Sequence, residues 1–136
     1  MERVSAEDAA HVAEFRAALR AFMRTTERNA RAAGLTPQRY MLLLMIKGAP
    51  DFSERSTVTE LAERLQLAQS TVTELVRRAE ETGLIERERS SADGRIAYLR
   101  LSAEGEQRLA RSFTTNETER RTLTQAFSHL EGKPIA

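Results

Sequence analysis

The chain has 136 residues, with 21 Lys plus Arg against 20 Asp plus Glu and a formal net charge of +1 at pH 7. A single domain of this size buries about two-thirds of its unfolded surface, so its core needs no disulfide or metal. The sequence has no cysteine, which excludes a disulfide scaffold, a Cys-ligated metal site and a thiol nucleophile.

The charge and hydropathy also restrict the protein class. A net charge of +1 excludes a nonspecific nucleic-acid coat but allows a local basic patch. No apolar run approaches the roughly 20 residues that span a bilayer, and the first ten residues are too charged for a signal peptide. We therefore expect a cytoplasmic protein with no membrane segment.

The first predicted helix covers residues 5–33. Ser5 is a favourable N-cap, Glu7 adds an acidic group to the first turn, and Gly34 is a natural stop. Apolar residues recur between these ends at steps of 3, 4 and 3, namely Val12, Phe15, Leu19 and Phe22. This narrow spacing is typical of a coiled-coil seam.

The second predicted helix belongs in the centre of the fold. Thr36 caps it, Pro37 occupies its first position, and it stops at Gly48. Residues 40–46 between these signals are almost wholly apolar. A helix that is apolar on all sides is expected to be buried.

Two short helices come next and form a helix-turn-helix candidate. Thr57 and Glu60 fit a capping box before a helix that reaches Leu65. The pattern recurs at Thr71 to Glu74 in a second helix that closes at Gly83. Residues 66–69 separate the two helices, which is the spacing expected of the motif.

The second helix of this pair, residues 69–82, divides into two faces. One face is apolar and is expected to pack on the preceding helices; it contains Val72, Leu75, Val76 and Ala79. The opposite face holds polar and charged side chains, namely Gln69, Ser70, Thr73, Glu74, Arg77, Arg78 and Glu81. Gln69, Ser70 and Thr73 suit base edges, and Arg77 and Arg78 suit phosphate or guanine. An ordinary solvated helix face is the alternative interpretation.

A β-hairpin is predicted after this helix. Residues 84–89 and 96–101 alternate imperfectly and flank the turn signal Asp93-Gly94. Arg87 and Arg89 share one strand face, and Arg95 follows the turn. Such an arginine-bearing tip suits a DNA minor groove, although an exposed solubilising turn would have the same residues.

The chain ends in two more predicted helices. Ser102 caps the first, which runs to about residue 112, and the last extends from about residue 114 to residue 130. Their apolar steps of 4 and 3 define a second seam, formed by Leu109, Phe113, Asn116, Arg120, Leu123, Phe127 and Leu130. Two seams in one chain favour a homodimer, although they could also pack on each other within a monomer.

Several motifs in fixed order identify a family. They are Thr57-Val58-Thr59-Glu60-Leu61-Ala62-Glu63-Arg64-Leu65, Ser70-Thr71-Val72-Thr73-x-Leu75-Val76, Gly83-Leu84-Ile85-x-Arg87, Asp93-x-Arg95 and Leu101-Ser102-x-x-Gly105. Together they resemble the MarR family of winged helix-turn-helix regulators. The resemblance covers nearly the whole chain, with its specific motifs between Thr57 and Gly105.

The resemblance implies a mainly α fold with a small β-hairpin wing, in which N- and C-terminal helices dimerise. The dimerisation helices would cover about residues 5–33 and 102–131, and the winged DNA-binding lobe about residues 36–101. Dimer contacts would come from Val12, Phe15, Leu19, Phe22, Leu109, Phe113, Leu123, Phe127 and Leu130. DNA contacts would come from Gln69, Ser70, Thr71, Thr73, Glu74, Arg77, Arg78, Arg87, Arg89, Asp93 and Arg95.

The resemblance also implies individual roles. The residue matching Asp93 holds the wing, and the one matching Arg95 reaches into the minor groove. The partner is double-stranded DNA with a pseudo-palindromic operator, and a small aromatic or phenolic effector binds between the lobes and releases a repressor. Glu74 departs from the pattern, because relatives often have a basic residue there, and a carboxylate facing a groove is repelled by phosphate unless it accepts from cytosine N4.

Other interpretations remain open. Phe15, Leu19, Tyr40, Met41 and Leu44 could line a ligand pocket or simply belong to the core. His11, Glu14 and His129 provide only two histidines, too few for a convincing metal site, so we expect no metal and no cofactor. No phosphate loop, nucleophile elbow or HExxH motif is present, so no catalytic residue is expected. A winged-helix protein-interaction module without specific DNA binding is the alternative function.

Overall fold

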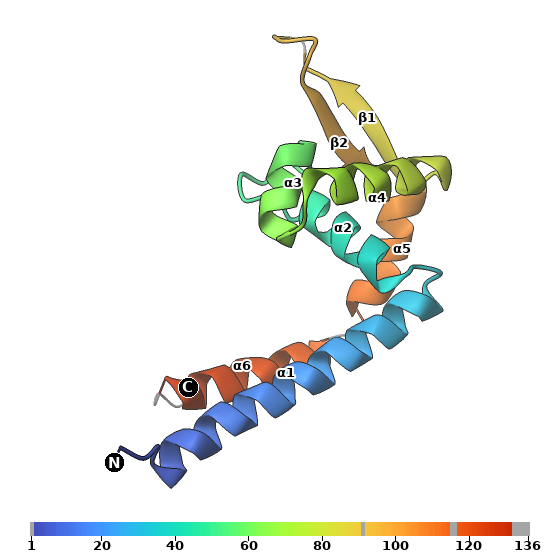
Figure 1. Cartoon of the computed structure of the whole chain (residues 1–136). Helices are drawn as coiled ribbons and strands as arrows, with labels where there is room; N and C mark the ends of the chain where they lie inside the picture. Colours follow the sequence, from blue (N-terminus) through green and yellow to red (C-terminus); the bar gives the residue numbers. More distant parts are fainter. Residues whose placement is uncertain (1, 91, 115–116, 132–136) are drawn as a thin grey trace.

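The computed structural model describes residues 2–90, 92–114 and 117–131, and within these residues it contains six helices and one antiparallel two-stranded sheet (Figure 1). In chain order the elements are α1 (Ala6–Ala32), α2 (Pro37–Lys47), α3 (Val58–Leu65), α4 (Gln69–Glu81), β1 (Ile85–Arg89), β2 (Ala97–Leu101), α5 (Ala103–Thr114) and α6 (Glu117–Leu130). The predicted fold class and element order are confirmed. Within the described ranges, none of the helices combines the length and apolarity needed to cross a bilayer.

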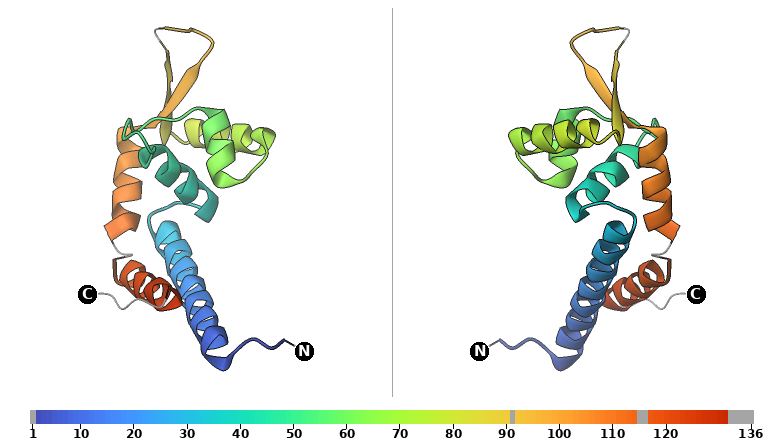
Figure 2. Two further views of the ribbon diagram at one scale, coloured as in Figure 1. Left: turned by 90° about the vertical axis from the view of Figure 1, so that its left-hand side faces the viewer. Right: turned by 90° about the vertical axis from the view of Figure 1, so that its right-hand side faces the viewer.

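The elements form two parts (Figures 1 and 2). The long helix α1 lies beside α6, which runs back along it so that the two ends of the chain are at the same end of the molecule. Phe15 and Phe127 join them, with ring centroids 6.0 Å apart. Helices α2 to α5 form the second part, and the β-hairpin projects from it at the end farthest from α6.

Side-chain caps fix the starts of three helices as the sequence predicts. Ser5 Oγ accepts from the backbone N–H of Asp8 at 3.0 Å, and Thr36 Oγ1 accepts from that of Arg39 at 3.1 Å. Thr57 and Glu60 form both bonds of a capping box, at 3.2 and 2.9 Å.

The expectation of a second capping box at Thr71 is wrong. Helix α4 already begins at Gln69, and its N-cap, Ala68, makes no side-chain hydrogen bond. The reason is the tight connection from α3, where Gln66 adopts the left-handed conformation (φ 58°) and Leu67 N–H donates to Ala62 O at 3.1 Å. The chain therefore enters the next helix a turn earlier than the Thr-Glu spacing suggested.

The core is built around α2, as its composition predicts. Leu42, Leu43 and Ile46 have no exposed surface and lie in one cluster with the apolar faces of α3, α4 and β2. Leu109 of α5 belongs to the same cluster and is only 5% exposed. Its expected place in the dimer seam is therefore corrected: α5 packs on α2 and β2, which turns Leu109 toward the core of its own chain.

A close backbone approach joins α5 to the end of α4. Ser102 Oγ donates to Gly83 O at 2.5 Å and accepts from Gly105 N–H at 3.1 Å, which makes it the cap of α5. Ser102 N–H donates to Leu84 O at 3.0 Å. A Cβ at position 105 would lie 2.1 Å from that same carbonyl oxygen, so only glycine fits there.

We predict that Gly105→Ala lowers the free energy of unfolding by about 1–3 kcal/mol, because the added methyl group forces the Leu84 backbone away. Helix propensity alone predicts the opposite sign, since alanine is favoured over glycine by about 1 kcal/mol. Gly94→Ala is the matched control, because no atom lies within 4 Å of its added Cβ. Urea unfolding measures both variants; an unchanged or higher stability of Gly105→Ala contradicts the clash.

Candidate nucleic-acid interface

Helix α4 has the two faces that its sequence predicts. Val72, Val76 and Ala79 have no exposed surface and pack into the core. The outer face carries the predicted DNA-contacting residues, which are all exposed except the half-buried Glu74; they are Gln69, Ser70, Thr71, Thr73, Arg77 and Arg78. The core contacts therefore hold a polar ridge outward from the winged part.

The amino-terminal half of α4 carries uncharged polar side chains that make at most one hydrogen bond each within the described residues. Gln69 Nε2 donates to Thr59 Oγ1 at 3.2 Å, which ties the start of α4 to α3. The hydroxyl groups of Ser70, Thr71 and Thr73 make no hydrogen bond with any residue that the structure describes. Hydroxyls both donate and accept, so they can contact base edges or phosphate oxygens.

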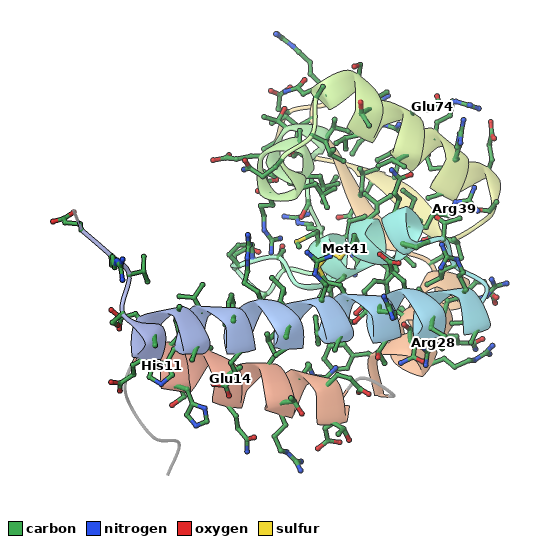
Figure 3. The ribbon with its side chains drawn as sticks, turned by 60° about the horizontal axis from the view of Figure 1, so that its bottom comes forward. His11, Glu14, Arg28, Arg39, Met41 and Glu74 are labelled. Carbon is green, nitrogen blue, oxygen red and sulfur yellow. The ribbon has the colours of Figure 1, made fainter. Side chains whose placement is uncertain are left out.

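An ion-pair cluster occupies the middle of the same face. Arg77 binds Glu74 through two nitrogens, Nε to Oε2 at 3.0 Å and Nη2 to Oε1 at 2.6 Å, and Arg78 Nε donates to Oε1 at 3.0 Å. Arg77 also pairs with Glu81 one turn later. These hydrogen bonds, from Arg77 first and Arg78 second, lower the pKa of the Glu74 carboxyl to about 2 and keep it ionised. Figure 3 marks Glu74 on α4.

Internal hydrogen bonds hold the wing and fix its tip. In the antiparallel pair, Ile85 lies opposite Leu101 and Arg89 opposite Ala97. Arg89 Nη1 donates to Gly94 O at 2.8 Å across the turn. Asp93 Oδ1 accepts from the backbone N–H of Arg95 at 3.0 Å, which is the arrangement of an Asx turn.

Two predicted wing arginines have different surroundings. The Arg87 guanidinium pairs with Glu80 of α4 at 3.0 Å, so it joins the wing to the helix. Arg95 is exposed, and its guanidinium has no hydrogen bond or ion pair with the part of the chain that the structure describes. The tip of the wing therefore presents a free cation at the same end of the molecule as α4 (Figure 2).

The paired strands of the wing contain a cluster that the sequence did not predict. Glu88 pairs with Arg100 at 3.0 Å and with Arg55 at 3.2 Å, and Arg55 stacks over the Tyr98 ring at 4.2 Å. The hydrogen bond from Arg100 is the main cause of the lowered Glu88 pKa. The only sequence signal for this cluster was the hairpin register, which sets Glu88 opposite Tyr98. Arg55 could not be predicted as a member, because it comes from the loop between α2 and α3, far from the hairpin in sequence.

The predicted dimer residues divide by exposure. Val12, Phe113, Phe127 and Leu130 are exposed, and four others are half-buried between the helices, namely Phe15, Leu19, Phe22 and Leu123. The seams of α1 and α6 therefore do pack on each other within one chain, yet they leave apolar surface uncovered. Asn116 of the predicted seam lies outside the described residues, and Arg120 stacks on the Phe113 ring at 4.3 Å.

Comparisons with known proteins agree with this arrangement. The sequence profile of the MarR family matches residues 33–96. The uncharacterized HTH-type transcriptional regulator YsmB of Bacillus subtilis is 27% identical over 125 residues, which cover 89% of this chain and 83% of YsmB. The chain is thus similar to MarR-family transcriptional regulators, by the family profile over residues 33–96 and by this relative over most of its length.

Solved structures of MarR-family regulators show a similar fold. The transcriptional regulator Tm0710 from Thermotoga maritima is 28% identical with a TM-score of 0.60, over 81% of this chain and 78% of that one. A MepR mutant from S. aureus, whose structure contains a bound oligodeoxyribonucleotide, is 20% identical with a TM-score of 0.66, over the same 81% and 78%. At that identity the likeness to MepR is one of fold.

The chain also has an apolar pocket of about 300 Å³ between α1 and α2. Of the residues that the sequence left between pocket and core, Tyr40, Met41 and Leu44 line it and Phe15 and Leu19 do not; the other lining residues are Phe22, Met23, Thr26, Glu27 and Pro37. Met41 is marked on α2 in Figure 3. Thr26 is 8% exposed, and its Oγ1 is buried with no hydrogen-bond partner among the residues that the structure describes.

His11, Glu14 and His129, which the sequence offered as a weak metal-site candidate, are not arranged as a metal site. His129 Nδ1 lies 2.9 Å from Glu14 Oε1, so α6 does bring this histidine to α1 (His11 and Glu14 are marked in Figure 3). Within the described ranges, no group of three or more His, Asp or Glu side chains is arranged to hold a metal ion. The pair instead joins the two helices near the ends of the chain.

Proposed function

We propose that this protein is a homodimeric, sequence-specific DNA-binding regulator of transcription that acts in the cytoplasm. The observation that supports it best is that α4, whose outer face is polar and exposed, and the β-hairpin wing, which carries the exposed Arg95, lie in the same part of the molecule, away from α6 (Figure 1). Helix α4 enters the major groove, and the wing places Arg95 in the adjacent minor groove, where the narrow-groove potential attracts a cation.

The two elements contribute differently to binding. Ser70 and Thr73 in the first half of α4 contact base edges and select the operator, whereas Arg95 contributes electrostatic affinity on most sequences. Two copies related by a two-fold axis read a pseudo-palindrome whose half-site centres are about 10 base pairs apart, or a multiple of that. A dimer seated across a promoter blocks access to it, so repression is the regulatory effect that we propose.

A protein-interaction module with this fold is the competing function. Protein interfaces are enriched at their centre in aromatic residues and depleted in charged ones. The outer face of α4 has the opposite composition, because hydroxyls, carboxylates and guanidiniums make up its exposed groups. This polar composition favours a hydrogen-bonding partner, such as the base edges of DNA, over an apolar protein surface.

We predict that the protein binds its own promoter region with a two-fold symmetric footprint and that Arg95→Ala weakens this binding on all sequences. Each subunit of the dimer loses one cationic contact, so the salt slope of the binding constant falls by about 2 per dimer. Fluorescence anisotropy at several salt concentrations measures both effects. Arg3→Ala, a charge-matched change in the segment before α1, is the control and leaves affinity unchanged. No complex with the promoter, or an asymmetric footprint, contradicts the proposed function.

The dimer is proposed from the apolar surface that α1, α5 and α6 leave uncovered. Phe113 is 44% exposed, Phe127 47% and Val12 48%, although Phe127 already contacts Phe15 within the chain. Helices α1 and α6 lie in the part of the molecule away from the wing, where a second copy covers them without obstructing α4 (Figure 1). Self-complementary packing about a two-fold axis is the common arrangement for such a surface.

We predict that Phe127→Asp converts the dimer into a monomer at micromolar concentration, because it places a charge in the apolar contact between copies. Phe52→Asp is the matched control: Phe52 is 91% exposed on the loop between α2 and α3, and its replacement leaves the dimer intact. Sedimentation velocity measures the mass, and circular dichroism checks that both variants are folded. A monomeric parent protein, or a dimer that survives Phe127→Asp, would exclude this interface.

The pocket between α1 and α2 is the effector site that we propose. Its walls are mainly apolar, and its polar groups are the hydroxyls of Thr26 and Tyr40 and the carboxylate of Glu27; no Lys or Arg is among its lining residues. Thr26 Oγ1 has no hydrogen-bond partner among the described residues. A carboxylate wall disfavours an anion, whereas a neutral phenol fills the apolar space and hydrogen-bonds to Thr26 or Glu27. The chemistry therefore favours an uncharged phenolic ligand over an aromatic carboxylate.

We predict that a substituted phenol raises the thermal unfolding midpoint by about 5 °C or more at 100 times its Kd, and that benzoate does so much less. Met41→Trp fills the pocket and abolishes the shift, whereas Phe52→Trp, a change outside the pocket, retains it. Differential scanning fluorimetry measures the shifts, and the phenol also lowers promoter affinity. An equal response to both compounds, or a shift that persists in Met41→Trp, contradicts this site.

A further inference from the structure

The ion-pair cluster in the middle of α4 is unusual for a surface that faces a polyanion. Glu74, Arg77, Arg78 and Glu81 contribute two positive and two negative charges, so the cluster is neutral. Both arginines share the carboxylate of Glu74. A neutral cluster gains little from phosphates, so its contribution to DNA binding has to come from hydrogen bonds of particular geometry.

The hydrogen bonds leave specific groups unused. Arg77 donates from Nε and Nη2 to Glu74 and from Nη1 to Glu81, so each of its nitrogens is engaged. Arg78 donates to Glu74 only from Nε, which leaves the N–H groups of its two terminal nitrogens. Glu74 Oε1 accepts from both arginines, whereas Oε2 accepts one bond and retains an acceptor site.

This arrangement places an acceptor beside a set of donors. A carboxylate only accepts hydrogen bonds, and in the major groove it matches the N4 amino group of cytosine. A guanidinium only donates, and it matches O6 and N7 of guanine. A C·G pair presents these partners side by side, whereas a T·A pair presents thymine O4, an acceptor that repels the carboxylate.

We propose that Glu74 is a specificity-determining residue that selects a C·G base pair in each half-site: Oε2 accepts from cytosine N4, and the carboxylate holds Arg78 so that its terminal N–H groups contact guanine. The inference rests on the proposed function, because it assumes that α4 enters the major groove. Arg77 acts as a positioning residue, because its two hydrogen bonds fix the orientation of the Glu74 carboxylate. The neutral cluster also limits binding to unrelated DNA, since both arginines already have a counter-charge.

The test compares Glu74→Gln with Glu81→Gln. Both variants remove one negative charge next to Arg77, but Glu81 lies about two turns further along α4, away from the amino-terminal half that enters the groove. Each full-length protein selects duplexes from a random pool at fixed salt, and anisotropy then measures affinity for the selected operator and for single-base replacements. Circular dichroism and sedimentation check fold and dimer.

The parent protein is expected to select one C·G pair per half-site and to lose roughly 5- to 100-fold in affinity when that pair becomes T·A. Glu74→Gln loses this discrimination and shifts toward adenine, which glutamine contacts through N6 and N7. Glu81→Gln retains the C·G preference. Both variants bind unrelated duplex more tightly than the parent protein does, because each has lost one negative charge.

Two outcomes overturn the inference, and they are distinguishable. If the parent protein selects an operator and Glu74→Gln selects the same one with equal discrimination, Glu74 does not read the base, and the proposed function stands. If the folded parent dimer enriches no sequence at all, the proposed function fails and this inference fails with it.

Discussion

The orientation of α4 on α2 is the constraint on which the DNA-facing surface depends. Val72, Val76 and Ala79 are fully buried against the core that α2 forms with Leu42, Leu43 and Ile46. Because an α-helix repeats every 3.6 residues, fixing this apolar stripe also fixes the opposite stripe. The polar ridge of α4 is thus a consequence of core packing, and replacing a buried valine would rotate or loosen the helix before it altered any outward side chain.

The arginine content of the winged part overstates its free positive charge. Arg77, Arg78, Arg87 and Arg100 each pair with a carboxylate of their own chain, and Arg89 is held by a backbone carbonyl. These exposed pairs contribute little stability individually, but they determine which nitrogens remain for a partner. Arg95 differs from these arginines because its guanidinium is held by none of the described residues. In the proposed complex, Arg95 therefore supplies unpaired positive charge at the wing tip, whereas the arginines of α4 already have counter-charges.

Local signals in the sequence were sufficient for most of the fold. The caps at Ser5, Thr36 and Thr57 depend on residues three positions apart, and the helix periods depend on residues within a few turns, so both are visible in one stretch of chain. The errors involve contacts between distant segments. Leu109 has seam spacing, but the packing of α5 on α2 turns it into the core. The partners of Arg87 and of Glu88 come from other elements, and no local pattern predicted them.

Helix α2 also connects the pocket to the DNA-facing surface. One side of it lines the pocket through Tyr40, Met41 and Leu44, and its buried residues pack in the cluster that holds α4. In a dimer, α1 and α6 fix one end of each subunit, so the tilt of α2 against α1 sets the distance between the two copies of α4. A half-site spacing of about 10 base pairs tolerates little change in that distance. A ligand that alters the α1–α2 contact therefore changes DNA affinity without contacting α4, provided that its affinity differs between the two tilts.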